Sequence, residues 1–352
     1  MTHDLLALVE VVGFLVAIMV LAHLCADEGL FEAVGHRVGR LARGSAPRAL
    51  GLAVAVAALV TVTLSLDATV VLLTPVLLAA STASTRRASA YATVRLANSA
   101  STLLPVSNLT NLLAWSATGL TFVGFTARML PVWAVTVALE YLVVRWWCRV
   151  DLRRPAARDE ADVRVPRLPA VVVLAVLVAL ALEVEPWIAA GTGAVVLAVH
   201  ALAGRRTSVG HLVRAANLPF AAAVVVWAWV VLLVGETAVG DAIGALLPRG
   251  SSWPALVATA LVAMLLAAAV NNLPATLLLL PAATAAGTDT VLAVLVGVNV
   301  GANLAFTSSL ANVLWWRSGG SSATSLRDFH RLGVLTTPVL VVLATTVLWL
   351  TT

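Results

Sequence analysis

The sequence predicts an all-α polytopic membrane protein with two inverted repeats, each holding a re-entrant helical hairpin and a broken transmembrane helix, plus scaffold helices. Three observations predict this fold: a very apolar composition, ten apolar stretches, and short phrases that recur in both halves. Of the 352 residues, 61% are hydrophobic and only 11% are charged, and the mean hydropathy is +1.00. Soluble domains carry about 25% charged residues, so this composition indicates a chain that crosses a bilayer many times.

The apolar stretches are the predicted membrane elements, and at about 20 residues per crossing the chain has length for roughly ten. They lie at about 5–25, 49–82, 89–118, 120–147, 168–184, 186–203, 215–235, 252–286, 290–316 and 334–351. The charged segment 149–167 contains Pro155 and Pro166 and is predicted to be an exposed loop. This loop divides the chain into a first repeat, 1–148, and a second repeat, 168–352.

The two repeats share three phrases in the same order, as expected of a transporter built from structural repeats. ADEGLFEAVG (26–35) resembles GETAVGDAIG (235–244), and Ala68-Thr69 recurs as Ala275-Thr276. ANSASTLLPVSNLTNLL (97–113) resembles ANLAFTSSLANVL (302–314). The residue pairs aligned by these phrases are Asp27 with Glu236, Glu32 with Asp241, Gly35 with Gly244, Asn98 with Asn303 and, after a four-residue gap, Asn111 with Asn312. We therefore assign hairpins to 49–82 and 252–286, broken helices to 89–118 and 290–316, and the last helix to 334–351.

The arginine distribution predicts the orientation. If 49–82 and 252–286 are re-entrant hairpins, 20 of the 22 arginines, Arg95 among them, fall on one face, and only Arg128 and Arg249 fall on the other. The positive-inside rule then makes the crowded face cytoplasmic. The N-terminus lies outside, loop 149–167 is cytoplasmic, and the two repeats are inverted. Two full spans in place of each hairpin would give the same count, so charge alone leaves both arrangements open.

Polar residues interrupt the apolar stretches at SLDAT, PVSNLTN, NNLPAT and TSSLAN, which are expected to be helix breaks. Irregular backbone survives in hydrocarbon only where it is buried in protein or lines a wet cavity, and broken helices mark midplane binding sites. The candidate substrate- or ion-binding residues of the first repeat are Ser65, Asp67, Thr69, Asn98, Ser107, Asn108, Thr110 and Asn111. Those of the second are Asn271, Asn272, Thr276, Asn303, Ser308, Ser309 and Asn312. Helix capping and interhelical hydrogen bonding are the alternative explanation.

Asp67 is the candidate proton-coupling residue, because it is the only charged residue between Ala49 and Thr85. An ionised Asp at a helix centre in the bilayer costs about 2.5–3.5 kcal/mol on insertion scales, which argues for a function or a partner. Uptake of a proton and binding of a cation are both open, as is a plain cap of the second hairpin arm. Glu10 and Glu140 also lie within spans and are weaker candidates.

Several functions are excluded or disfavoured by what the chain contains. All 22 basic residues other than histidine are arginines, so a Walker A lysine is impossible. Cys25 and Cys148 are too far apart in sequence for a CxxC site, and no metal centre or cofactor is predicted. The arginines lie between apolar runs and are expected to face anionic lipid rather than nucleic acid. A membrane-embedded enzyme or a structural subunit stays as a minor alternative, since no nucleophile–base pair is visible.

LDATVVLLTPVLLA, ANSASTLLPVSNLTNLL, ANLAFTSSLANVLWWR and RDFHRLGVLTTPVLVVLA together resemble the arsenical pump membrane protein (arsenite/antimonite permease) family. That family belongs to the ion transporter superfamily, with citrate, dicarboxylate and NhaD-type sodium/proton transporters. The resemblance implies hairpin tips and helix breaks that line the substrate path. It also implies export of arsenite or antimonite across the plasma membrane, coupled to protons, either alone or with a separate cytoplasmic ATPase, and a homodimer.

Two further expectations follow from the resemblance and the site chemistry. The family usually begins with additional N-terminal spans, whereas this chain starts almost directly at ADEGLFE, so a shorter scaffold is expected. Arsenite at neutral pH is an uncharged trihydroxide, which suits a ring of hydroxyls and amides around one carboxylate. A sodium/proton antiporter, or another ion or carboxylate transporter of the superfamily, is the alternative.

Overall fold

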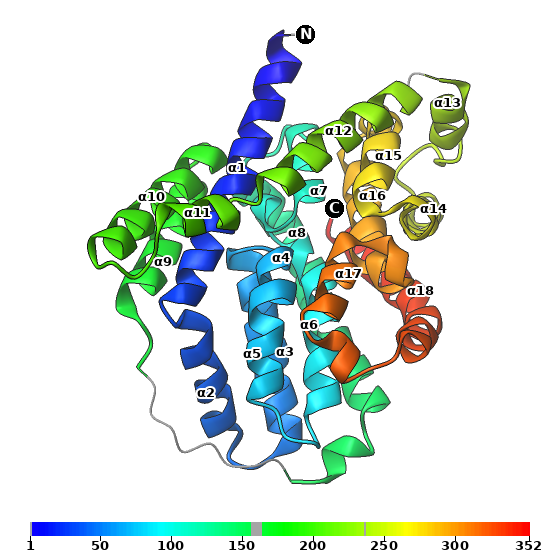
Figure 1. Ribbon diagram of the computed structural model, residues 1–352. Helices are drawn as coiled ribbons and strands as arrows, with labels where there is room; N and C mark the ends of the chain where they lie inside the picture. Colours follow the sequence, from blue (N-terminus) through cyan, green and yellow to red (C-terminus); the bar gives the residue numbers. More distant parts are fainter. Residues whose placement is uncertain (1, 156–163, 236) are drawn as a thin grey trace.

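The computed structural model describes residues 2–155, 164–235 and 237–352, and these residues form helices and turns without a strand (Figure 1). The first half contains α1 (Thr2–Asp27), α2 (Leu30–Ala42), α3 (Ala46–Thr63), α4 (Leu66–Ala68), α5 (Thr74–Ala79), α6 (Arg86–Ser99), α7 (Leu109–Ser116) and α8 (Phe122–Trp147). The second contains α9 (Arg167–Ala181), α10 (Pro186–Ala203), α11 (Val209–Ala215), α12 (Leu218–Gly235), α13 (Ala238–Gly244), α14 (Trp253–Val270), α15 (Asn272–Ala286), α16 (Thr288–Val300), α17 (Leu310–Arg317) and α18 (Leu326–Thr351). The predicted all-α membrane fold is confirmed.

Most helices start and end close to the predicted stretches, and the largest difference has a local cause. The last helix was expected to begin at residue 334, but α18 begins at Leu326. Ser325 caps it by accepting a hydrogen bond from the Asp328 backbone N–H, so the polar first turns are helical too. Loop 149–167 lies between α8 and α9 as predicted, and its residues 156–163, which include Arg158, lie outside the described residues. Glu236, which the sequence pairs with Asp27, also lies outside them.

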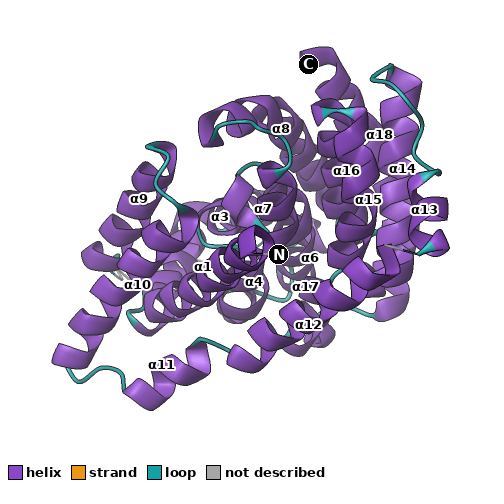
Figure 2. Cartoon of the chain, turned by 90° about the horizontal axis from the view of Figure 1, so that it is seen from above, coloured by secondary structure: helices purple, strands orange, loops and turns teal. Residues whose placement is uncertain are grey.

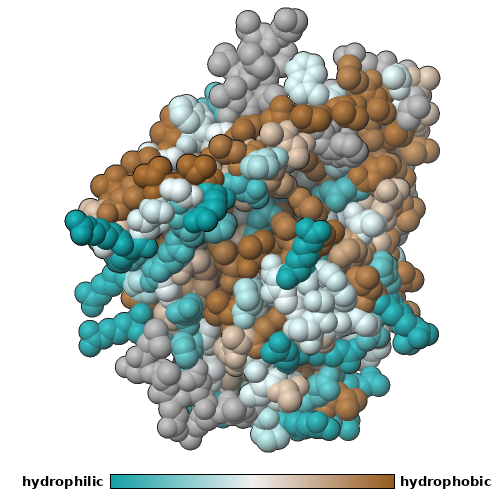
Figure 3. All heavy atoms as spheres, viewed as in Figure 1, coloured by the Kyte–Doolittle hydropathy of each residue, from teal (hydrophilic) through white to brown (hydrophobic). Residues whose placement is uncertain are grey.

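Within the described residues, five helices are long and apolar enough to cross a membrane, namely α3, α8, α10, α14 and α18, and there are six such spans if the bent pair α1–α2 forms one. Seen from above, α1 lies near the centre, with α9 and α10 on one side and α14, α16 and α18 on the other (Figure 2). Apolar side chains cover much of the upper surface, whereas hydrophilic ones gather toward the lower edge (Figure 3). This distribution is that of a multi-pass membrane protein.

Each predicted hairpin consists of an 18-residue arm, a one- or two-residue break, and a returning arm. In the first, α3 ends at Thr63 and the chain returns through α4, a π-helical turn η1 (Thr69–Leu73) and α5. In the second, α14 ends at Val270 and α15 returns directly. Eighteen residues span about 27 Å of helix, which is enough to cross the hydrocarbon, so re-entrance and the inverted orientation of the repeats stay predictions.

The two broken helices have the same local structure at a constant spacing. After α6 come the 3-10 turns η2 (Ala100–Thr102) and η3 (Pro105–Ser107), and after α16 come η5 (Gly301–Asn303) and η6 (Phe306–Ser308). Each element starts 201 residues after its counterpart. The predicted alignment with a four-residue gap is therefore wrong, and Asn98 corresponds to Asn299 rather than to Asn303. The sequence alignment paired Asn98 with Asn303 because the dipeptide Ala-Asn occurs at both 97–98 and 302–303.

The halves interlock at these breaks. Ala311 and Trp315 of α17 belong to a hydrophobic cluster that includes α1, α3 and α6 of the first half, while Ala114 of α7 belongs to one that includes α14, α16 and α18 of the second. Each terminal half-helix is thus buried against the other half of the protein. This exchange places both breaks at the interface between the two halves, where a site can take residues from each.

Candidate functional site

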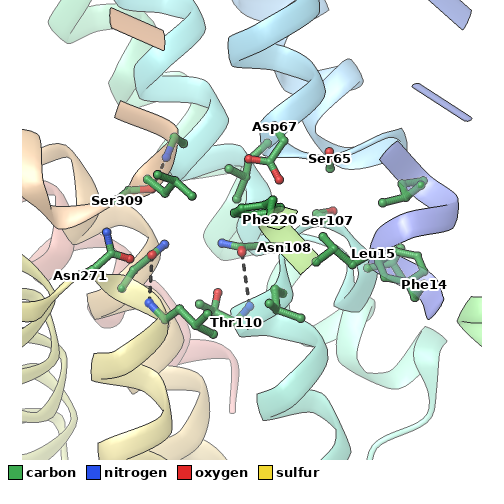
Figure 4. Close-up of a pocket in the computed structure, with 18 of the residues that line it drawn as sticks. Phe14, Leu15, Ser65, Asp67, Ser107, Asn108, Thr110, Phe220, Asn271 and Ser309 are labelled. Atoms are coloured by element: carbon green, nitrogen blue, oxygen red, sulfur yellow. Dashed lines mark hydrogen bonds between the residues drawn. The ribbon is translucent and has the colours of Figure 1, made fainter. Parts of the chain in front are cut away.

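The two hairpin tips and the two helix breaks meet at one cavity of about 520 Å³ (Figure 4). Eight of the predicted site residues line it: Ser65, Asp67, Ser107, Asn108, Thr110, Asn271, Asn272 and Ser309. Tips separated by about 200 residues in the chain therefore face the same space. The predicted convergence of the four polar clusters is present in the structure, whereas the role of each residue in binding stays a prediction.

Both hairpin tips use a backbone conformation that is nearly restricted to glycine. Ser65 has φ 148° and ψ 168°, and Asn271 has φ 83° and ψ 154°. Such a conformation costs about 1–3 kcal/mol in a residue with a side chain, and it concentrates at binding sites. The recurrence of this strain at both tips, beside one cavity, is a structural argument that the tips act on a ligand.

Hydrogen bonds tie each tip to the helix break of the same half. The Ser107 hydroxyl donates to the Val62 carbonyl at the end of α3 (3.1 Å). In the second half, the Thr307 hydroxyl donates to the Ala268 carbonyl (3.1 Å) and the Asn271 amide donates to the Thr307 carbonyl (3.2 Å). A shift of a tip would thus disturb the helix break beside it, and a shift of the break would disturb the tip.

Asp67 is the second residue of α4, and its side chain faces the cavity (Figure 4). Ser65, not Asp67, caps this helix, because the Ser65 hydroxyl accepts the Ala68 backbone N–H (3.2 Å). The capping explanation of Asp67 is therefore wrong. Among the described residues none donates a hydrogen bond to the Asp67 carboxylate or pairs with it, and the described lining contains no basic side chain. The carboxylate is free to bind a proton or a cation.

An apolar wall completes the cavity, and the sequence did not reveal it. Phe14, Leu15 and Ile18 of α1 and Phe220 and Ala223 of α12 also line the cavity, and three of them are labelled in Figure 4. Apolar residues within apolar stretches carry no signal that separates cavity-facing from lipid-facing positions. Their contribution could be found only from the packing of α1 and α12 across the tips.

Asn111 and Asn312 lie behind the cavity and satisfy the carbonyls that the breaks leave free. The Asn111 amide donates to the carbonyls of Ser101 (2.7 Å) and Leu104 (3.0 Å). The Asn312 amide donates to those of Ala302 (2.9 Å) and Ala305 (3.1 Å). Each asparagine thus bonds the residues ten and seven positions before it, which is what irregular backbone inside a membrane protein requires.

A reciprocal pair of bonds joins the two breaks. Asn98 donates to the Asn312 side-chain oxygen (2.8 Å), and Asn299 donates to that of Asn111 (2.6 Å). Asn299 is fully buried, and the sequence analysis missed it. Its signal is its place 201 residues after Asn98, which only the correct register exposes.

The remaining predicted residues are also buried and do not line the cavity. Thr69 shares a hydrogen bond with Thr61 (2.8 Å), Thr276 donates to the Asn272 carbonyl (2.8 Å), and Ser308 accepts the Ala305 N–H (3.1 Å). Asn303 donates to Ser99 (2.9 Å) and to Glu140 (3.1 Å). These side chains hold the tips and breaks in place.

A buried ion pair lies beside the second break. Arg95 of α6 is 2% exposed and donates to Glu140 of α8, which is 0% exposed. The prediction that Arg95 lies on the cytoplasmic face is wrong. In a sequence, an arginine within an apolar stretch can mark either the cytoplasmic end of a helix or a buried ion pair, and here it belongs to a buried ion pair. Ser99, Asn303 and Thr336 complete the network. Neither charge reaches the cavity lining, and Glu10 does not line it either.

No group of three His, Cys, Asp or Glu side chains lies close enough to hold a metal ion within the part of the chain that the structure describes. The site thus offers one carboxylate, neutral polar side chains and the backbone groups at the tips and breaks.

Comparison with curated proteins gives no match. The model of the citrate transporter family (CitMHS) matches residues 6–311. The matched range contains both hairpins, both helix breaks and every residue that lines the cavity. The chain belongs to the citrate transporter family of the ion transporter superfamily, and it is a secondary membrane transporter.

Proposed function

We propose that the protein exports arsenite or antimonite through the cavity between the hairpin tips and the helix breaks, with proton coupling at Asp67. The observation that carries the proposal is the character of the lining. It holds one carboxylate and seven neutral polar side chains, and no Arg, Lys or His among the described residues. A site of this kind favours a solute without net negative charge.

Charge decides between solute classes. A free tricarboxylate beside Asp67 would place like charges together in a poorly solvated space with no basic side chain to balance them. Arg95, which is buried, is already paired with Glu140 and does not line the cavity. Uncharged arsenic trihydroxide brings hydrogen-bond donors and acceptors to hydroxyls and amides, and it loses no ionic solvation on entry.

Asp67 supplies the coupling in this proposal. Its carboxylate faces the solute space without an internal partner, so it can take up a proton from one side of the membrane and release it on the other. Exchange of one proton for one uncharged solute would let the proton gradient drive export. A cytoplasmic ATPase partner and a homodimer remain predictions of the resemblance.

A citrate-type carboxylate that enters together with a cation is the second candidate, and the family match favours it. The cation would lie between Asp67 and the solute carboxylates and cancel the repulsion that excludes the free anion. The amides of Asn108, Asn271 and Asn272 would then bind carboxylate oxygens.

Everted membrane vesicles from an arsenite-sensitive host test both candidates. We expect uptake of radiolabelled arsenite that needs the proton gradient and stops with a protonophore. Citrate uptake that requires a divalent cation, without arsenite uptake, would establish the second candidate. Sodium-dependent proton flux without uptake of either solute would contradict both and identify an antiporter.

A further inference from the structure

One side-chain oxygen behind the cavity has no hydrogen-bond donor. Asn98 is 1% exposed, and its Oδ1 atom is buried without a partner. Its Nδ2 atom lies 2.9 Å from Asn303 Oδ1, 2.8 Å from Asn312 Oδ1 and 3.3 Å from the Val94 carbonyl. Because all three are acceptors, a flipped amide would place oxygen against oxygen three times, so the orientation is determined by the network.

The acceptors around Asn98 are themselves held in one orientation. The Asn312 amide nitrogen donates to two backbone carbonyls, and that of Asn303 donates to the Arg95 carbonyl, to Ser99 and to Glu140. Neither can turn its nitrogen toward Asn98 without losing these bonds. Unpartnered buried acceptors are rare in proteins and destabilising, so the Asn98 oxygen calls for a donor from elsewhere.

The counterpart of Asn98 shows what is missing. Asn299 Oδ1 accepts hydrogen bonds from Asn108 Nδ2 (3.0 Å) and from the Thr110 hydroxyl (2.9 Å). At the same spacing of 201 residues, Asn108 is replaced by Ser309 and Thr110 by Ala311. The unsatisfied oxygen thus arises from two shorter side chains in the second half.

Ser309 still caps its helix as Asn108 does, but Ser309 and Ala311 do not donate hydrogen bonds to Asn98 as Asn108 and Thr110 do to Asn299. Asn108 Oδ1 accepts the Thr110 backbone N–H at the start of α7 (3.3 Å), and Ser309 Oγ accepts that of Ala311 at the start of α17 (3.2 Å). Ser309 and Ala311 both line the cavity, as do Asn108 and Thr110. A group that enters from the cavity at Ser309–Ala311 approaches Asn98 from the direction in which Thr110 approaches Asn299.

We propose that Asn98 Oδ1 is a subsite for a hydroxyl group of the transported solute, which enters beside Ala311 and supplies the missing donor. The inference rests on the proposed function in that the cavity holds the solute. It selects hydroxylated solutes and lies only on the side of the cavity formed by Ser309 and Ala311, because Asn299 on the other side is satisfied internally. The hydroxyl can come from arsenite or from the central carbon of citrate, and the experiment separates these sources.

The test compares Ala311→Thr with Ala311→Val, two side chains of nearly equal shape, in the purified full-length protein without solute. The threonine hydroxyl supplies the donor that Thr110 supplies to Asn299, whereas valine does not. We expect the threonine variant to unfold about 2–4 °C above the valine variant, the shift expected for one added buried hydrogen bond. Equal unfolding temperatures would overturn the proposal.

Transport supplies the second measurement, in the vesicles described above. For the wild type, we expect a KM for arsenite about tenfold below that of Ala311→Thr, because the threonine occupies the acceptor. If citrate is the solute, the wild type should prefer it about tenfold over tricarballylate, which lacks only the hydroxyl, and the preference should disappear in Ala311→Thr. A wild-type KM in Ala311→Thr, or equal use of citrate and tricarballylate by the wild type, would overturn the subsite.

A second variant that supplies a donor to Asn98 keeps the test decisive if Ala311→Thr does not fold. Ser309→Asn restores the counterpart of Asn108 and keeps an oxygen for the helix cap, so it should raise the arsenite KM in the same direction. If the wild type carries neither arsenite nor citrate, the proposed function fails. The unfolding comparison at position 311 needs no solute and then decides alone whether the Asn98 oxygen accepts a donor from that side.

Discussion

The two broken helices have the same backbone but different side chains at the positions that face the cavity. Leu104 and Ala305 have φ/ψ of −106°/147° and −134°/155°, and Asn108 and Ser309 have −154°/145° and −150°/141°. Yet Asn108 and Thr110 bind Asn299, whereas Ser309 and Ala311 leave Asn98 unsatisfied. The difference teaches that the repeat conserves the way the backbone is supported and changes what the site offers.

The hairpin tips repeat the lesson. Ser65 and Asn271 share a strained backbone, but Asp67 of the first tip has no acidic counterpart, since the second tip reads Asn271-Asn272-Leu273-Pro274. The first tip thus presents a carboxylate without a described partner, whereas Ser309 and Ala311 at the second break leave the Asn98 oxygen of the first half without a donor. The two tips thus have similar backbones but present chemically different groups to the same cavity, which suits the binding of both a solute and a coupling ion.

The largest effect is expected at the ion pair, whose network includes Ser99 just before the first break and Asn303 in the second. Glu140→Leu leaves Arg95 buried without its partner and should destabilise the fold by about 3–5 kcal/mol. Thermal unfolding in detergent measures the loss. The matched control Arg95→Met with Glu140→Leu removes both charges and should recover much of the stability. A single variant as stable as the wild type would show that Asn303 and Ser99 alone hold the break.

Asp67→Asn tests the asymmetry of the tips. The variant should keep the fold, because no described residue bonds the carboxylate, yet lose about 100-fold in proton-driven transport, or about 2.7 kcal/mol at 1.36 kcal/mol per tenfold. Vesicle uptake measures this. Asp289→Asn is the control, since Asp289 pairs with Arg128 away from the cavity. Uptake by Asp67→Asn equal to that of the control would remove Asp67 from the coupling step.

Asn111→Ala and Asn312→Ala compare the supports of the two breaks. Each frees two buried carbonyls and should destabilise the protein by about 1–3 kcal/mol. Asn111→Ala should be the more harmful, because Asn299 then loses the one acceptor that its amide nitrogen has among the described residues, while Asn98 keeps Asn303. Denaturant or thermal unfolding of the two variants ranks them, and the reverse order would mean that the first break relaxes more easily.

The smallest difference is expected at the paired glycines, where α2 and α13 pack on the returning arms. A Cβ added at Gly35 would lie 2.8 Å from Val76 Cγ1, whereas one at Gly244 would lie 3.3 Å from Ala282 Cβ. Gly35→Ala should therefore cost about 1–3 kcal/mol and Gly244→Ala about 1 kcal/mol or less. Unfolding temperatures of the two variants, side by side, test whether the first hairpin is packed more tightly.

The sequence alone determined the fold class, the positions of the long apolar helices and the four polar breaks, whereas α2 and α13 lie outside the predicted stretches. Hydropathy reports the solvent around a helix, and a polar residue inside an apolar run is costly enough to stand out. For the same reason, Asp67 is conspicuous in the sequence itself, and its cavity-facing position agrees with the expectation of a functional carboxylate. The membership in the ion transporter superfamily was also visible in the motifs that surround these breaks.

Tertiary structure alone decided which polar residues meet the cavity and which support it. Asn111 and Asn312 looked like ligands in the sequence, but their amides bond the breaks behind the lining. Arg95 and Glu140 are about 45 residues apart, and only packing shows that they neutralise each other. Phe14 and Phe220 are indistinguishable by type from lipid-facing residues. Composition records what a side chain is, whereas its role here depends on the neighbour it faces, and neighbours distant in the chain are set by packing.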